Sequence, residues 1–247
     1  MLRRLAQDVF DLCYPGVCAN CKAGCDPGAF LCRTCSDQLR ALEQAAACDL
    51  CAKPIASDGA PCPFCEGKGE PHYDRIFRLG TFDEPLKNLI HQMKYHGRWG
   101  VAERLAERLL AQPKVAALVA GADVLVPVPL HPIRHFNRGY NQAAVVARVI
   151  ARTSGKRVLR PISRIRHTEM QTHLHTKQKR FENLRRAFRL RDGRGVRGKR
   201  VLVIDDVMTT GATLQTIART FRPAGLESLS ALVIAVADPK HRNFQTV

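Results

Sequence analysis

Eight cysteines near the N-terminus follow one spacing that occurs twice. In each copy, two Cys-x2-Cys pairs are separated by ten residues, and the second copy repeats the first with every cysteine shifted by thirty positions. The eight residues are Cys18, Cys21, Cys32, Cys35, Cys48, Cys51, Cys62 and Cys65. Each pair makes a tight turn that points two thiolates at one place, so two pairs supply the four ligands of a tetrahedral zinc site. A segment this short buries too little apolar surface to fold alone, and we expect zinc to stabilise it.

Length and composition bound the class of protein. The 247 residues suffice for one ordinary domain and a smaller one, and an apolar fraction of 45% is typical of a globular chain. No stretch approaches the roughly 18 apolar residues of a membrane-spanning helix. Residues 1–12 begin like a signal peptide, but Gln7, Asp8 and Asp11 interrupt the apolar region. We expect a short docking helix there, and a cytoplasmic protein without a membrane span.

Two other interpretations of the cysteines compete with zinc. A disulfide framework needs an oxidising compartment, which the N-terminal residues argue against. A redox-active Cys-x-x-Cys follows a strand of a thioredoxin-like unit and does not come as a duplicated set. The spacing leaves open whether each copy forms its own site or the copies exchange pairs. Cys13 and Cys25 fall outside the pattern and are expected to be free thiols.

The composition and the pattern of apolar residues change after the last of these cysteines. Residues 66–71 are a polar hinge, and strand and helix patterns then alternate. We expect strands at 76–82, 124–128, 201–204 and 229–236, and helices at 84–95, 100–111, 140–153 and 212–222. This alternation predicts an α/β fold, a parallel sheet with helices on both faces. The expected domains are 1–68, an N-terminal helix with a double zinc ribbon, and 72–247, the α/β domain.

The most informative segment of the second domain is 201–213. Four apolar residues form a strand, and Asp205 and Asp206 stand at its C-terminal end, where ligands bind in open α/β sheets. A hydroxyl-rich turn with Gly211 follows and opens a helix, whose backbone N–H groups and positive dipole end suit a phosphate. Paired carboxylates accept hydrogen bonds from vicinal sugar hydroxyls. The segment therefore predicts a phosphate pocket next to a ribose pocket.

Two alternatives exist for this segment. Signalling receiver domains also open with an apolar run and an acidic pair that binds magnesium, but there the pair lies near the start of the domain. The other alternative is an ordinary strand that ends in two solvated aspartates, with Thr210 or Thr213 capping the helix.

Segment 201–213 resembles the binding motif for phosphoribosyl pyrophosphate (PRPP) in type I phosphoribosyltransferases, and the chain around it resembles the ComF/GntX family. The double cysteine module is similar to the N-terminal half of that family, and Tyr140 stands where Phe is more usual. The other matching segments and residues are Phe82, 94–97, 126–130, 138–142, Arg164, Thr168, Gln171, Leu174, 180–184 and 187–188.

The resemblance implies roles for particular residues. Asp205 and Asp206 would hold the ribose hydroxyls of PRPP. The 5′-phosphate would be held by Val207, Met208, Thr209, Thr210, Gly211, Ala212 and Thr213. The pyrophosphate and its Mg²⁺ would lie at the loop with Arg134, Arg138 and Gly139, where the ion keeps several waters. A loop that closes over PRPP would include Arg164, Arg166, Thr168, Gln171 and Arg180.

Charge and resemblance together leave several functions open. The net charge is +17, and residues 160–200 hold fourteen Lys or Arg against three acids. Such a segment attracts polyanions, either PRPP or a polynucleotide, or it is a solvated loop that is merely basic. The resemblance implies transfer of phosphoribose to a nitrogen acceptor and a link to natural competence, with single-stranded DNA and the cytoplasmic face of the DNA-uptake machinery as partners. A non-enzymatic DNA-handling protein and a PRPP sensor are the alternatives, and the sequence identifies neither acceptor nor oligomeric state.

Overall fold

The α/β domain is built on a five-stranded sheet in which every pair of neighbouring strands is parallel. A computed structural model of the chain describes residues 16–66, 72–166 and 187–237. The strand order is β1 (Ile76–Thr81), β7 (Ser228–Val236), β6 (Arg200–Met208), β2 (Val124–Pro127) and β3 (Arg157–Val158). Strand β6 therefore lies at the centre, and its C-terminal end meets those of β2 and β7 at one edge of the sheet.

Apolar residues on both faces of the strands explain why this sheet is buried. Along β6, Leu202 and Ile204 belong to one core, whereas Val201 and Val203 belong to the core on the opposite face. This period of two is the side-chain geometry of a strand, and a parallel sheet needs apolar residues at both kinds of position because helices cover it.

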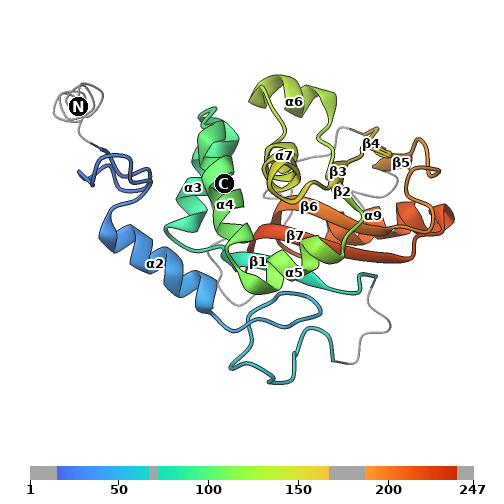
Figure 1. Cartoon of the computed structure of the whole chain (residues 1–247), viewed down its shortest axis with the longest axis horizontal. Coiled ribbons are helices and arrows are strands. Elements are labelled where there is room, and N and C mark those ends of the chain that lie inside the picture. The colour runs from blue at the N-terminus through green and yellow to red at the C-terminus, as the bar shows by residue number, and fades with distance from the viewer. Residues whose placement is uncertain (1–15, 67–71, 167–186, 238–247) are drawn as a thin grey trace.

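Helices cover the two faces unequally (Figure 1). One core is closed by α2 (Arg33–Gln44), α3 (Leu86–Tyr95), α4 (Trp99–Leu110), α5 (Pro113–Gly121) and α7 (Gln142–Ser154). The other is closed by α9 (Ala212–Phe221), the 3-10 turn η2 (Arg222–Ala224) and a hairpin of β4 (Ile162–Arg164) and β5 (Phe188–Leu190). Helix α6 (Pro132–Arg138) contributes no buried residue. The predicted parallel sheet with helices on both faces is confirmed.

The structure differs from the expected elements most at β6. This strand runs four residues beyond the expected end, because Asp205, Val207 and Met208 stay paired with β7. The apolar run marked only the part of the strand that is buried on both faces. Strands β1 and β2 each end one residue earlier than expected, and α2, α5, α6, β3, η2 and the hairpin β4–β5 were not predicted.

The two cysteine repeats form the same local structure. An antiparallel bridge closes the first Cys-x-x-Cys turn at Val17 and Gly24 and the second at Ala47 and Pro54, again thirty positions apart. Lys22 and Ala52, also thirty apart, both take a positive φ, of 67° and 56°. The duplication seen in the cysteine spacing is therefore a duplication of backbone conformation.

The first repeat packs against the α/β domain through α2. Gly80 in β1 lets this helix approach, because a Cβ there would lie 3.1 Å from the Leu42 Cβ. Arg108 in α4 donates to both carboxylate oxygens of Glu43, at 2.6 and 2.9 Å. Cys18, Cys35 and Leu39 are buried in the same core as α3 and α4. The division of the chain near residues 68–72 remains a prediction.

Membrane-spanning character is lacking among the described helices: none of them is both long and apolar enough to cross a bilayer.

Candidate active site and metal centres

Asp205 and Asp206 lie side by side in the last part of β6 and point to opposite faces of the sheet. Asp206 faces α3, where the Lys94 Nζ lies 3.2 Å from its Oδ1. Only 14% of the Lys94 side chain and 15% of the Asp206 side chain are exposed, so water screens this ion pair weakly. Lys94 therefore fixes one carboxylate of the pair and partly neutralises it.

Asp205 faces the side of the sheet that α9 covers. Burial, followed by repulsion from Asp206, raises the pKa of Asp205 to about 7. Burial, followed by the charge of Asp205, raises the pKa of Tyr73, a phenol that donates a hydrogen bond to the Leu214 carbonyl at 2.9 Å. The pair is therefore held so that one carboxylate is ion-paired and the other resists ionisation near neutral pH.

The turn that follows the strand leads directly into α9. Thr209 and Thr210 form the turn, and Gly211 takes the N-cap position of the helix with a φ of 81° that favours glycine. Ala212 N donates to the Thr210 Oγ1 at 3.4 Å. The N-cap residue Gly211 has no side chain of its own to cover the first N–H groups of the helix. Such an end favours an anion.

Three arginines bring positive charge to the same edge. Burial and the neighbouring charge of Arg138 lower the pKa of Arg134. Burial and then Arg134 lower the pKa of Arg164 to about 10, while Asp205 acts in the opposite direction. Cations that repel one another in a desolvated place favour an anion that lies between them. The arginines thus place a potential suited to a polyanion near the acidic pair.

The loop that carries two of these arginines has clear local causes. Pro132 occupies the first turn of α6, and the His131 ring accepts a hydrogen bond from Ile133 N. The helix ends at Gly139, which has a φ of 72°. A residue with a β-carbon would be strained in this conformation. Asn141 then caps α7 and donates to the Val128 carbonyl at 2.9 Å, which ties the loop to the end of β2.

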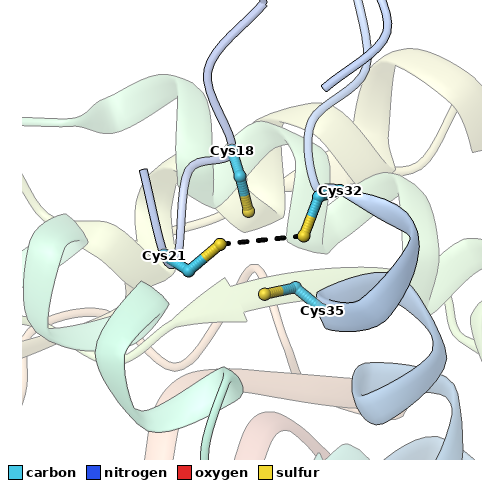
Figure 2. Close-up of side chains that lie close together, drawn as sticks. All are labelled: Cys18, Cys21, Cys32 and Cys35. Atoms are coloured by element: carbon cyan, nitrogen blue, oxygen red, sulfur yellow. Dashed lines mark hydrogen bonds between the residues drawn. The ribbon is translucent and has the colours of Figure 1, made fainter. Parts of the chain in front are cut away.

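The cysteines form two separate four-sulfur groups, each within one repeat. Cys18, Cys21, Cys32 and Cys35 make the first, and Figure 2 shows their sulfurs converging on one point. Cys48, Cys51, Cys62 and Cys65 make the second. The question of exchange between copies is thereby resolved. Cys25 lies outside both groups, as expected, and its Sγ contacts the Ala29 carbonyl, while Cys13 lies outside the described residues.

The sulfur spacing fits zinc. In each group all sulfurs lie within 4.8 Å of one another, with Cys21–Cys32 and Cys51–Cys62 separations of 3.7 Å. A tetrahedral site with Zn–S bonds of about 2.3 Å places its sulfurs roughly 3.8 Å apart. Burial raises the pKa of Cys35 to about 12, so four thiolates need a cation to share this space. Both groups can bind zinc.

Two cavities adjoin the arginine loop. One of about 430 Å³ lies between the loop, α7 and the hairpin β4–β5, and another of about 420 Å³ lies between α4 and α7. They share Gly139, Tyr140 and Arg148. Among the residues that the structure describes, six arginines line the two cavities together, against a single carboxylate, Glu103. The exposed indole of Trp99 borders the second one.

The structure brings together most of the residues selected from the sequence. The acidic pair, the turn and the loop meet at one sheet edge, and Arg164 at the end of β4 joins them. Arg166 follows β4 and is exposed, whereas Thr168, Gln171 and Arg180 lie outside the described residues. The sequence alone gives Lys94 no role in the site. Lys94 lies in the last turn of α3, a helix that was predicted. Only the tertiary structure shows that this turn lies against Asp206.

Comparisons with known proteins found a matching domain family and several relatives. Residues 101–245 match the family model of the phosphoribosyl transferase domain. The DNA utilization protein YhgH of Salmonella typhimurium is 32% identical over 84% of this chain and 91% of its own length. Competence protein F of Haemophilus influenzae is 31% identical over 84% and 90%. A purine phosphoribosyltransferase from Pyrococcus horikoshii aligns over 56% of this chain and 74% of its own, at 14% identity and a TM-score of 0.36.

Proposed function

The chain belongs to the phosphoribosyl transferase domain family and, within it, to the ComF family, and from this premise we propose that it binds PRPP at the C-terminal edge of its sheet. Asp205 and Asp206 would bind the ribose hydroxyls. The turn and first helical residues 207–213 would bind the 5′-phosphate. Arg134, Arg138 and Gly139 would lie at the pyrophosphate, and Arg164 and Arg166 in the loop that closes over it, together with Thr168, Gln171 and Arg180 outside the described residues.

One observation carries this proposal: an acidic pair and a set of mutually repelling arginines occupy the same edge of one sheet. PRPP needs both, because it joins a diol to a monophosphate and a diphosphate. The carboxylates also fit Mg²⁺, a hard cation that prefers oxygen ligands and would neutralise diphosphate charge. Lys94 Nζ holds the Asp206 carboxylate at 3.2 Å, and a carboxylate accepts hydrogen bonds from sugar hydroxyls well.

The proposed reaction is transfer of phosphoribose to a nitrogen acceptor. The bond from the anomeric carbon to the pyrophosphate oxygen breaks, and pyrophosphate leaves with the electron pair. The acceptor nitrogen forms the new bond and releases a proton. Positive charge develops on the sugar, as in glycoside hydrolysis, so the acidic pair would stabilise the transition state while the arginines hold the leaving group.

The raised pKa of Asp205 means that this residue lowers the free energy of unfolding at neutral pH. The folded chain keeps the proton up to about pH 7, whereas the unfolded chain releases it near pH 3.9, so stability falls as pH rises between these values. Asp205→Asn should therefore raise Tm at about pH 8 by roughly 3–6 °C and give a smaller gain near pH 5. Thermal melts by circular dichroism measure both values, and a gain independent of pH would contradict the assigned protonation.

A DNA-handling function is the second candidate, in which the protein works on the cytoplasmic side with single-stranded DNA and the uptake machinery. The two arginine-lined cavities and the exposed Trp99 favour it. Arginines bind the phosphate backbone of a single strand, and aromatic rings stack on its bases. The relatives carry names that refer to DNA utilization and competence. Binding of an oligonucleotide should weaken steeply with salt, and flat salt dependence would remove this candidate.

Calorimetric titration with PRPP and Mg²⁺ tests the first function. We expect binding to the wild-type chain and none to the double variant Asp205→Ala/Asp206→Ala. Asp192→Ala, an exposed carboxylate paired with Arg194, is the matched control and should bind normally. Pyrophosphate release with added bases, amines or DNA ends then separates a transferase from a protein that only senses PRPP. Tight binding without turnover on any acceptor would favour the sensor.

A further inference from the structure

The first cysteine cluster is hydrogen-bonded to α3 through the two residues between Cys18 and Cys21. Gln92 Nε2 donates to the Ala19 carbonyl at 2.7 Å. Asn88 Nδ2 donates to the Asn20 Oδ1 at 2.9 Å. Asn20 in turn donates from its Nδ2 to the sulfur of Cys35 at 3.3 Å. A metal-ligating sulfur and the surface of α3 are thus joined by a short path of hydrogen bonds.

The other end of the same helix reaches the proposed PRPP pocket. Lys94, two residues after Gln92, pairs with Asp206. The carbonyl of Met93 accepts hydrogen bonds from the Tyr140 hydroxyl and from the Gln142 Nε2, which belong to the segment that follows the arginine loop. The C-terminal turn of α3 therefore contacts both halves of the site, the acidic pair and the pyrophosphate loop.

Gln92 is well placed to couple the contact with Ala19 to the contacts that Met93 and Lys94 make with the proposed pocket. It is 6% exposed, and its Oε1 accepts from the Arg98 Nη1 at 3.0 Å, which leaves the side chain little freedom. Asn88 and Gln92 are four residues apart and lie on one face of α3. Because helix hydrogen bonds make neighbouring residues move together, a shift at Gln92 displaces Met93 and Lys94.

We propose that Asn88 and Gln92 are positioning residues that hold the PRPP pocket in register with the first cysteine cluster, so that metal in this cluster and PRPP in the pocket stabilise each other. The inference rests on the proposed function for its second half. It assigns the first cluster a role beyond folding of its own repeat, since its geometry sets where Lys94 and the Met93 carbonyl stand.

The second repeat offers the matched control. Leu50 occupies the position equivalent to Asn20 and is 44% exposed. Asp49, equivalent to Ala19, pairs at 3.3 Å with Lys114 of α5, a residue of the cavity at the N-terminal ends of β6 and β7. The second cluster thus contacts the opposite edge of the sheet, and changes there should leave the PRPP pocket in place.

The test compares Gln92→Met and Asn20→Ala with Leu50→Ala and Lys114→Ala in the zinc-loaded full chain. Methionine keeps the volume of Gln92 but removes its hydrogen bonds. We call Gln92→Met and Asn20→Ala the relay variants. We expect them to weaken PRPP binding about fivefold and to speed hydrogen exchange in residues 139–142, while the controls match wild type. In wild type, PRPP should slow zinc release to a chromogenic chelator, since coupling is reciprocal. In a Lys94→Ala background the effect of Gln92→Met should shrink.

The outcomes separate the two proposals. If wild type binds PRPP and the relay variants leave both affinity and exchange unchanged, the positioning role is overturned. If wild type does not bind PRPP but Gln92→Met still speeds exchange at 139–142, the proposed function fails and the positioning of this loop stands. Equal weakening of PRPP binding by Leu50→Ala would show general destabilisation and would also overturn the inference.

Discussion

The two cysteine repeats share a spacing and a turn geometry, yet they sit in the molecule differently. Cys18 and Cys35 of the first are 0% and 3% exposed and belong to the main core, although Cys21 is exposed, whereas the second has one buried cysteine, Cys48, and three half-buried ones. The second repeat also borders two cavities, of about 450 and 490 Å³, so it is packed less tightly. Duplication preserved the four-sulfur group, and the surroundings determine what each copy supports.

The difference lies in residues that the spacing does not show. The first repeat continues into the amphipathic helix α2, which packs on β1, and carries Ala19 and Asn20 against α3. The second repeat has short turns and an exposed ion pair at the equivalent place. A metal site inside a core stabilises the whole domain, whereas one at the periphery stabilises its own loop. The following three variant pairs test that contrast.

Loss of one ligand from each repeat gives the largest expected difference. Cys35→Ser should lower the free energy of unfolding by roughly 3 kcal/mol or more, because the main core opens at the metal site. Cys65→Ser should cost the α/β domain no more than about 1 kcal/mol. Urea unfolding followed by circular dichroism measures both, with zinc analysis showing one ion lost from each variant. Equal destabilisation by the two changes would break the comparison.

The residue before the first Cys-x-x-Cys turn of each repeat gives a second test of the difference between the repeats. A Cβ at Gly16 would lie 2.7 Å from the carbonyl oxygens of Cys25 and Asp26, whereas the second repeat carries Ala46 at the equivalent position. Gly16→Ala should destabilise the chain by about 1–3 kcal/mol and speed zinc release from the first cluster. Ala46→Gly should cost less than about 1 kcal/mol. Urea unfolding and a chromogenic chelator measure the two quantities, and an unchanged stability of the Gly16→Ala variant would mean that the first turn is as loosely packed as the second.

The ion pairs that join each repeat to the α/β domain give the smallest effects. Arg108 and Glu43 form a two-bond pair with 30% and 15% of their side chains exposed, so Arg108→Ala should cost about 1–2 kcal/mol. Lys114 and Asp49 are 70% and 67% exposed, and Lys114→Ala should cost less than about 0.5 kcal/mol. Denaturant unfolding at low and high salt measures both, and a larger loss for Lys114→Ala would reverse the assigned order.

The sequence predicted those parts of the fold that depend on local pattern. Apolar runs located β6 and β7, and the repeated spacing located both sulfur clusters, because strand burial and metal ligation leave periodic marks. It did not locate the hairpin β4–β5, whose strands are separated by more than twenty residues. Nor did it assign Lys94 to the site, since an ion pair across more than a hundred residues has no local signature. The same reason hid the contact between Gln92 and Ala19.

Crystals of the zinc-loaded chain grown with PRPP and Mg²⁺ test the central claim most directly. The account predicts density for a ribose at the end of β6, against Asp205 and Asp206, and for its 5′-phosphate against residues 209–213, with the diphosphate toward Arg134 and Arg138. Clear density for PRPP elsewhere on the protein, or an empty sheet edge at saturating ligand, would contradict it.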